Sequence, residues 1–230
     1  SSLSTLKIKA SDHILEIGTG WGSMAIHAAE KYGCRVTTTT ISERQFAMAK
    51  ERVEAKGLAD RVTLLKKDYR DLEGQFDHAV SVEMIEAVGA ENYPVYFKTV
   101  SNLLKPGGRF AMQAITIADQ HYEYAKGEAD FIKRYIFPGS CIPSVTALCQ
   151  AATEHSFLRL QELMTMSEHY ARTLKIWREN LKEHEGAIRA EYGDRFWRMW
   201  DLYLTYCEAG FAETYIQSQQ LVFERPLFEA

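Results

Sequence analysis

Short apolar runs alternate with longer amphipathic stretches in the first half of the chain. The apolar runs, rich in β-branched residues, predict five strands at residues 13–15, 36–41, 61–65, 78–82 and 109–115. The stretches between them predict helices, one of which begins after Ser42 as its N-cap and stops at Gly57. Residues 105–108, Lys-Pro-Gly-Gly, predict a turn before the fifth strand. This alternation predicts a mainly parallel sheet with helices on both faces, which binds ligands at the carboxyl ends of its strands.

The second half carries many aromatic residues and few strand signals from about residue 120 onward. Helices are predicted at 144–155 and between about 170 and 210, followed by a last strand at 216–223. We therefore expect one domain over residues 1–230, in which a helical insertion at about 120–210 caps the ligand edge of the sheet.

Composition narrows the function classes. A net charge of −4 over 230 residues argues against nucleic acid as a partner. The four cysteines are widely spaced and form no C-x-x-C pair, so they indicate no zinc or redox site and favour free thiols in a reducing cytosol. No apolar run is long enough to cross a membrane, and the N-terminus has no signal peptide. Because the chain lacks an initiating Met and soon reaches its first strand, we expect an upstream segment to be missing.

Residues 16–22, Glu-Ile-Gly-Thr-Gly-Trp-Gly, join the first predicted strand to the first helix. Glycines permit a tight turn and a close approach of the backbone to a ligand, and a helix N-terminus offers free N–H groups. The spacing is G-x-G-x-G, not the G-x-G-x-x-G of dinucleotide sites, and no acid ends the second strand. With Glu16 before the first glycine, the pattern favours S-adenosylmethionine (SAM), whose ammonium group this acid would attract. A turn that binds no ligand is the alternative.

Residues 14–22 resemble the first motif of class I SAM-dependent methyltransferases. Three further strings resemble the cyclopropane-fatty-acyl-phospholipid synthase family, which includes the mycolic acid cyclopropane synthases: Thr-Ile-Ser-Glu-Arg-Gln at 40–45, Val-Glu-Met-Ile-Glu-Ala-Val-Gly at 82–89 and Tyr-Ile-Phe-Pro-Gly at 135–139. The resemblance covers essentially the whole chain. It implies a Rossmann-like α/β fold with a mainly parallel seven-stranded sheet, helices on both faces and a helical cap insertion.

The SAM-binding residues that the resemblance implies follow the first three predicted strands. The methionine part of SAM would contact Glu16, Gly18, Thr19 and Gly20. The ribose would contact Thr40, Ile41 and Gln45. The adenine would contact Asp68, Tyr69 and Arg70. Asp68 would accept a hydrogen bond from the adenine amine, and Tyr69 would pack on the ring. An exposed strand-end turn is the alternative for Arg70.

The family's reaction implies the catalytic residues. The cis double bond of an unsaturated phospholipid acyl chain attacks the SAM methyl group, and a base then removes a proton so that a cyclopropane ring closes. The intermediate carbocation requires an apolar site that excludes water. In the family the base is a bound bicarbonate, which Glu86, Tyr170, Gln113 and the backbone of Ile115 would hold here. Many relatives have His at the position of Gln113. The Gln side chain can donate an N–H to an anion but, unlike His, cannot titrate near neutral pH.

The second half also offers a place for the lipid. Its aromatic residues form either a channel for the acyl chain or plain core: Phe131, Ile132, Tyr135, Ile136, Phe137, Trp177, Trp197, Trp200, Tyr203 and Phe211. Its basic residues meet lipid phosphates or form a solvated helix face: Arg134, Arg172, Lys175 and Arg178. We therefore expect a cytoplasmic enzyme, peripherally bound at the inner face of the membrane. Whether it forms a homodimer stays open.

Other functions remain in view. Proton loss from another carbon, or a hydride shift before proton loss, would give a methylene- or methyl-branched acyl chain, an outcome that Gln113 keeps open. A methyltransferase of another hydrophobic small molecule, or a non-enzymatic module that binds lipid or SAM, would share the cofactor turn. NAD-dependent chemistry is least compatible with the glycine spacing.

Overall fold

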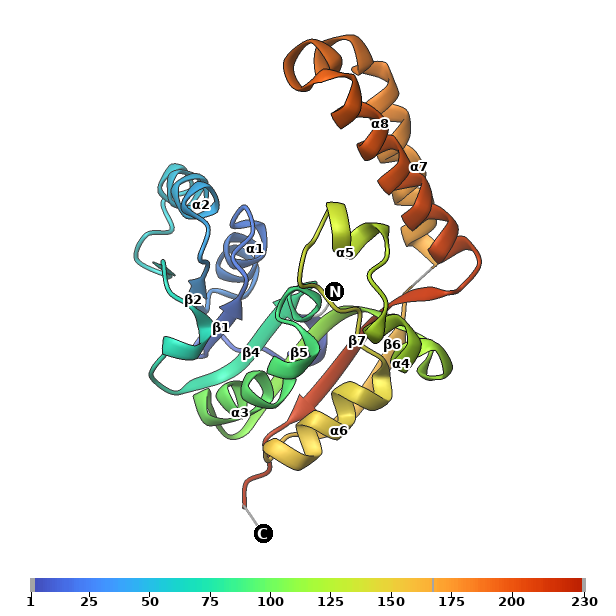
Figure 1. Cartoon of the computed structure of the whole chain (residues 1–230). Helices are drawn as coiled ribbons and strands as arrows, with labels where there is room; N and C mark the ends of the chain where they lie inside the picture. The colour runs from blue at the N-terminus through green and yellow to red at the C-terminus, as the bar shows by residue number, and fades with distance from the viewer. Residues whose placement is uncertain (1–2, 167, 229–230) are drawn as a thin grey trace.

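The computed structural model describes residues 3–166 and 168–228, so the outer ends of the expected 1–230 domain lie outside the described residues. Its centre is a seven-stranded sheet with the order β3-β2-β1-β4-β5-β7-β6 (Figure 1). The strands are β1 (His13–Ile17), β2 (Arg35–Thr39), β3 (Val62–Leu65), β4 (Phe76–Val82), β5 (Leu104–Ile117), β6 (Arg159–Thr165) and β7 (Ile216–Glu224). Strands β1 to β5 pair in parallel, whereas β7 runs antiparallel to β5 and β6. The predicted mainly parallel sheet is confirmed.

Helices cover both faces of the sheet, because successive side chains of a strand point to opposite faces. The covering helices are α1 (Ser23–Tyr32), α2 (Glu43–Ala55), α3 (Tyr93–Leu103) and α6 (Val145–His155). Ile14 of β1 is buried against residues of α1 and α2. Its neighbours Leu15 and Ile17 are buried on the other face, against α3 and α6. The core therefore has two layers, one on each side of the sheet.

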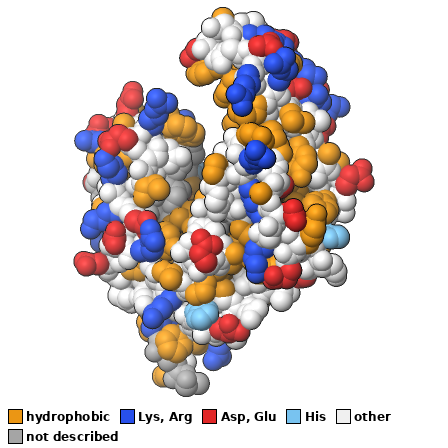
Figure 2. All heavy atoms as spheres, viewed as in Figure 1, with side chains coloured by type: hydrophobic (Ala, Val, Ile, Leu, Met, Phe, Trp, Pro, Cys, Tyr) orange, Lys and Arg blue, Asp and Glu red, His pale blue; other side chains and the backbone are white. Residues whose placement is uncertain are grey.

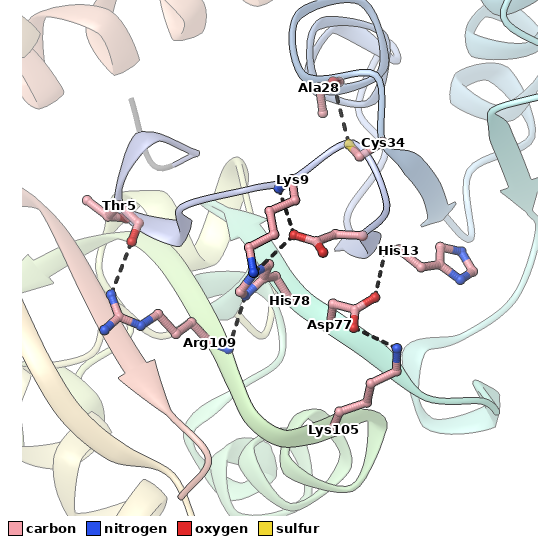
Figure 3. Close-up of polar contacts among 10 residues, drawn as sticks. Thr5, Lys9, His13, Ala28, Cys34, Asp77, His78, Lys105 and Arg109 are labelled. Carbon is pink, nitrogen blue, oxygen red and sulfur yellow. Dashed lines mark hydrogen bonds and ion pairs between the residues drawn. The ribbon is translucent and has the colours of Figure 1, made fainter. Parts of the chain in front are cut away.

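Polar contacts join the amino ends of the central strands (Figure 3). Asp77 accepts hydrogen bonds from the backbone N–H of His13 at 2.8 Å and from the ammonium of Lys105 at 2.6 Å. The ring of His78 accepts one from the backbone N–H of Arg109 at 3.3 Å. These contacts fix β1, β4 and β5 at the edge of the sheet opposite to the carboxyl ends, where ligands are expected.

Two long helices, α7 (Glu168–Glu183) and α8 (Glu185–Ala212), form a hairpin that projects from the body of the molecule (Figure 1). Gly193 kinks α8 with φ 84° and ψ 165°. The base of the hairpin packs with α4 (Asp119–Gly127) on an apolar cluster that includes Tyr122, Leu174 and Leu204. The short helix α5 (Phe131–Tyr135) lies between the hairpin and the body (Figure 1).

The structure differs from the sequence expectations at two elements. Residues 105–108 lie within β5, not in a turn before it. Gly107, with φ 78°, donates its N–H to the carbonyl of Arg225 at 2.7 Å, so the segment keeps a backbone partner while the register against β4 shifts. Strand β6 was not predicted. All 7 of its residues are exposed, so no alternation of apolar and polar positions marks it.

The expected cap at 120–210 is also interrupted. Helix α6 packs on α3, and β6 pairs with β7, so both elements belong to the layered body. The helices outside that body are α4 and α5, which precede α6 and β6 in the chain, and α7 and α8, which follow them. No helix within the described ranges is both long and apolar enough to cross a bilayer.

Candidate active site

The turn after β1 carries three glycines with left-handed backbone. The φ angles are 98° at Gly18, 51° at Gly20 and 82° at Gly22, values that other residues rarely adopt. The N–H groups of Gly18 and Thr19 donate to the carbonyl of Thr39 at 3.1 and 3.0 Å, which joins the turn to the end of β2. A Cβ atom at Gly20 would meet no described atom within 4 Å. The turn therefore leaves space for a ligand close to its backbone and to the start of α1.

Glu16, near the end of β1, is the first unusual carboxylate of the site. The residue is 4% exposed, and its Oε2 has no hydrogen-bond partner among the described residues. Burial raises the pKa of Glu16 to about 8, which a hydrogen bond with Thr38 only partly opposes. A buried carboxylate oxygen without a partner costs free energy. This oxygen is therefore suited to a cationic ligand group, and the SAM ammonium fits it.

The residues predicted at the ribose lie together between β2 and α2. The hydroxyl of Thr40 donates to Oε1 of Gln45 at 2.8 Å and accepts from the N–H of Ser42 at 3.1 Å. Ser42 caps α2 by accepting from the N–H of Gln45 at 3.3 Å, as predicted. Ile41 is 77% exposed. Because the preceding Thr39 contacts the glycine turn, all three predicted residues lie beside that turn.

The residues predicted at the adenine form a short turn after β3. Asp68 accepts from the backbone N–H, Nε and Nη2 of Arg70, each at 2.9 Å, and these bonds lower the pKa of Asp68. The Tyr69 side chain is mostly buried, with its ring edge-on to Tyr96 at a centroid distance of 5.2 Å. The structure thus pairs Asp68 with Arg70 at the surface and turns most of the Tyr69 ring into the core. Their contacts with adenine stay predictions.

A second carboxylate with a buried oxygen, that of Glu86, follows β4. Oε1 of Glu86 accepts from the N–H of Ile115 at 2.5 Å, while its Oε2 is buried without a partner among the described residues. Burial raises the pKa of Glu86 to about 7, and the charge of Glu83 adds to this shift. A carboxylate with a pKa near neutrality, in surroundings that exclude water, can stabilise a cation or exchange a proton. Two of the predicted catalytic residues therefore meet, in direct contact with each other.

The other two predicted catalytic residues, Gln113 and Tyr170, meet on Glu83. Nε2 of Gln113 donates to Oε1 of Glu83 at 3.0 Å, and the Tyr170 hydroxyl donates to Oε2 at 2.6 Å. The Oε1 of Gln113 accepts from Gln220 at 3.1 Å, which fixes the orientation of its amide. Tyr170 also stacks on Phe211, with ring centroids 4.5 Å apart.

Sequence reasoning missed Glu83 as a site residue. It has φ 49°, a left-handed conformation that costs a non-glycine residue about 1–2 kcal/mol. One signal was present in the sequence, because Glu83 directly follows a predicted strand and lies in the same string as Glu86. The neighbouring Met84 packs 3.5 Å from where a Cβ atom on Gly18 would lie. The loop of Glu83 therefore lies against the cofactor turn.

An apolar groove of about 420 Å³ lies between α7, α8 and Phe137. Figure 2 shows hydrophobic side chains along the hairpin and a hollow between the hairpin and the lobe of α1 and α2. The groove is lined in part by four of the predicted channel residues, Phe137, Trp177, Trp200 and Tyr203. Tyr170, which donates to Glu83, packs in the same apolar cluster as Trp200 and Tyr203, so the groove approaches this carboxylate.

The sequence matches the family model of mycolic acid cyclopropane synthetase over residues 1–221. It is 40% identical over 222 residues to the tuberculostearic acid methyltransferase of Mycobacterium tuberculosis and 39% identical over 220 residues to the cyclopropane-fatty-acyl-phospholipid synthase of Escherichia coli K12. These alignments cover 95% and 96% of this chain, but 52% and 55% of the two relatives. The chain thus spans about half the length of these curated relatives.

Among solved structures, the fold is similar to that of the cyclopropane synthase MmaA2 from Mycobacterium tuberculosis. The TM-score is 0.89 at 24% identity, over 97% of this chain and 81% of that chain. Together with the strand order, this similarity confirms the predicted class I methyltransferase fold.

Proposed function

The chain belongs to the mycolic acid cyclopropane synthetase family, and on this premise we propose that it transfers the methyl carbon of SAM to the cis double bond of an unsaturated phospholipid acyl chain, forming a cyclopropane. One observation carries the proposal. The adjacent strands β1 and β4 bring Glu16 and Glu86 to the same edge of the sheet, and each has one buried oxygen without a partner among the described residues. Methyl transfer to an alkene involves two cationic groups, the ammonium of the cofactor and the cation formed on the acyl chain.

The residues of the glycine turn and of its neighbouring loops would bind SAM, which supplies an electrophilic methyl group. Glu16 would pair with the ammonium, and the open backbone beside Gly20 would receive the methionine part. Thr40 and Gln45, which are joined by their own hydrogen bond, would lie beside the ribose. The adenine would border the turn that begins at Asp68.

Glu86 would stabilise the cation on the acyl chain. Above its pKa of about 7 this carboxylate is ionised, and its free oxygen is shielded from water. In such surroundings an anion stabilises a nearby cation more than it would in bulk water. The apolar groove of the hairpin, with its volume of about 420 Å³, has the size and lining of a site for an acyl chain.

Bicarbonate, which the sequence resemblance implies as the base, does not fit the described site. The N–H of Ile115 already donates to Glu86, while the hydroxyl of Tyr170 and the amide of Gln113 already donate to Glu83. Each donor assigned to the anion therefore faces a carboxylate of this chain, and we derive no step through bicarbonate.

A second product is favoured by the relative of 40% identity, whose name describes a fatty acid methyltransferase and not a cyclopropane synthase. The same methyl transfer gives a methyl-branched alkene if the proton leaves a chain carbon next to the cation. It gives a methylene branch if a hydride first shifts from the methylated carbon to the cationic carbon and the proton then leaves the added methyl group. These outcomes use the same cofactor and carboxylates as ring closure, and they differ from it in the hydride shift or in which C–H bond breaks.

We also propose that the enzyme works as a peripheral protein at the inner face of the cytoplasmic membrane, where phospholipid acyl chains are available. The exposed Arg172 and Lys175 lie on α7 close to the exposed Trp177 of the groove. Cationic and aromatic side chains in this combination favour the interface of an anionic bilayer.

The test is to incubate the protein with methyl-labelled SAM and vesicles of a cis-monounsaturated phospholipid, and to analyse the fatty acids by mass spectrometry. A gain of one CH2 with loss of the olefin indicates a cyclopropane, whereas the same gain with the olefin retained indicates a methylene- or methyl-branched chain. Glu86→Gln should lower the transfer rate, whereas Glu91→Gln, which changes an exposed carboxylate in the same loop, should not. Intact SAM binding without any transfer to lipid would contradict the proposed substrate.

A further inference from the structure

Glu83 lies where β4, β5 and the hairpin meet, and none of the steps above uses it. Its two carboxylate oxygens accept from Gln113 on β5 at 3.0 Å and from Tyr170 on α7 at 2.6 Å. Its own N–H donates to the carbonyl of Gln113 at 2.8 Å, so both backbone and side chain are fixed. We propose that Glu83 is the general base of the reaction, a carboxylate of the chain that occupies the place of an external anion. This inference rests on the proposed function.

The hydrogen bonds around Glu83 leave it able to accept a proton. A carboxylate oxygen has two lone pairs, so each oxygen of Glu83 keeps one after its bond to Gln113 or Tyr170. The charge of Glu83 also contributes to the raised pKa of Glu86, so the two carboxylates repel each other.

The surroundings of Glu83 place it between the glycine turn and the apolar groove. Met84, the next residue, packs against the turn at Gly18, and Tyr170, which donates to Glu83, packs in one apolar cluster with Tyr203 of the groove. The backbone of Glu83 is held at φ 49°. Strained conformations of this kind persist where the surrounding structure holds them, and they concentrate at functional sites.

The proposed step balances without a further reactant. After methyl transfer, the acyl chain carries a cation next to the added methyl group. One oxygen of Glu83 takes a proton from that methyl group, and the electron pair of the broken C–H bond forms the last C–C bond of the ring. The cation is neutralised and Glu83 becomes a neutral carboxylic acid. Because Glu83 is half-buried, it can release the proton to solvent when the product leaves.

Two substitutions separate the base from its hydrogen-bonding role. Glu83→Gln keeps the size of the side chain but removes the carboxylate. Glu83→Gly suits the left-handed backbone and vacates the space between Gln113 and Tyr170, which then become free to bind an added anion. Glu91→Gln is the matched control, since it changes an exposed carboxylate a few residues along the same loop.

Methyl transfer to vesicles of a cis-monounsaturated phospholipid is then measured in buffer freed of carbon dioxide, with and without added bicarbonate. We expect the unaltered chain and Glu91→Gln to work equally well in both buffers. Glu83→Gln should be slower by about 100-fold or more, the range of general-base catalysis. Glu83→Gly should be as slow without bicarbonate and recover about tenfold or more when it is added, because the anion replaces the lost base.

A bicarbonate-dependent rate of the unaltered chain, together with near-normal activity of Glu83→Gln, would overturn the inference and leave the proposed function standing. A titration of 13C-labelled bicarbonate by NMR requires no turnover. Saturable binding to Glu83→Gly but not to the unaltered chain supports the inference, and binding to the unaltered chain contradicts it. Failure of the unaltered chain to transfer any methyl group would instead overturn the proposed function, so the two failures are distinguishable.

Discussion

At the scale of single residues, the buried carboxyl of Glu16 opposes folding and favours ligand binding. Its pKa rises on folding from 4.5 to about 8, so the folded state disfavours the ionised form. For a carboxyl shifted in this direction, stability decreases as the pH rises through that interval, and the full penalty is present above about 8. A bound cation would remove the penalty, since it supplies the partner that Oε2 lacks within the described part of the chain.

Glu16→Gln should therefore stabilise the protein without ligand and weaken SAM binding. We expect a gain in unfolding free energy of at most about 5 kcal/mol above pH 8, which shrinks as the pH falls toward 4.5, because the pKa rises from 4.5 to about 8 and each pKa unit corresponds to about 1.4 kcal/mol. SAM affinity should fall about tenfold or more, the loss expected for a charged hydrogen bond. Denaturant titrations at several pH values and calorimetric SAM titration measure both effects.

Glu51→Gln, on the exposed side of α2, is the control for Glu16→Gln. Equal stability of Glu16→Gln and the unaltered protein at high pH would contradict this account.

The glycines of the cofactor turn should respond differently to the same substitution. A Cβ atom at Gly22 would lie 3.0 Å from Cβ and 3.3 Å from Cα of Ala49, so Gly22→Ala combines strain with a clash against α2. We expect a loss of about 2 kcal/mol or more. At Gly20 a Cβ atom meets no described atom within 4 Å, so Gly20→Ala should cost only about 1 kcal/mol yet fill the space intended for SAM. Gly22→Ala should therefore lose more stability, and Gly20→Ala should lose more SAM affinity. Unfolding and SAM titrations of both variants measure the two effects, and an equal loss of stability in both would contradict the proposed role of Gly20.

Sequence reasoning named residues of the candidate site but not the contacts among them. Glu16 and Glu86 could be named because each lies in a motif at a strand end, and the structure brings both to one edge of the sheet. The partnership of Gln113 and Tyr170 with Glu83 could not be predicted in this way. Gln113 lies 30 positions and Tyr170 lies 87 positions from Glu83 in the sequence. The contact of Tyr170 with Glu83 also depends on how the hairpin packs against the sheet.

At the scale of elements, the hairpin of α7 and α8 offers a matched pair of glycines. Gly193 has φ 84° and kinks α8, whereas Gly186 lies in the same element without a positive φ. Neither Cβ position meets a described atom within 4 Å, so only the backbone conformation separates the two sites. Gly193→Ala should destabilise the hairpin by about 1–3 kcal/mol, and Gly186→Ala should stabilise it by about 0.5–1 kcal/mol. Hydrogen exchange of the α7 and α8 amides should rise in the first variant and fall in the second. The same response in both would mean that the kink has no energetic role.

Elements were predictable where they repeat a buried pattern. The first five strands and the helices between them alternate between apolar strand runs and amphipathic stretches. Strands β1 to β4 lie within two residues of their expected bounds, whereas β5 begins at Leu104, five residues before its expected start. Strand β6 has no such pattern because it is exposed throughout at the edge of the sheet. The pairing of β6 with β7 is a tertiary interaction, and local propensity does not report it.

At the scale of the whole molecule, charge is distributed unevenly. The net charge of −4 would repel an anionic bilayer at long range. Figure 2 nevertheless shows Lys and Arg side chains gathered along the hairpin, next to its hydrophobic side chains. Within about a Debye length of a membrane, a local basic face outweighs a distant net charge. The molecule is therefore expected to approach the membrane with its hairpin first, which would bring the apolar groove to the acyl chains.

Reversing two exposed charges on α7, Arg172→Glu together with Lys175→Glu, should test this orientation. We expect the double variant to bind vesicles of unsaturated phosphatidylglycerol about tenfold less tightly or worse, because each basic residue near an anionic surface contributes about 1 kcal/mol. Added salt should weaken binding of the unaltered protein in the same direction. Co-sedimentation measures both effects, and unchanged SAM affinity would show that the site is intact. Lys98→Glu, an exposed charge on α3 at the body, should leave vesicle binding nearly unchanged. If Lys98→Glu weakens binding as much as the double variant does, net charge and not the hairpin controls the attraction, and the proposed orientation is wrong.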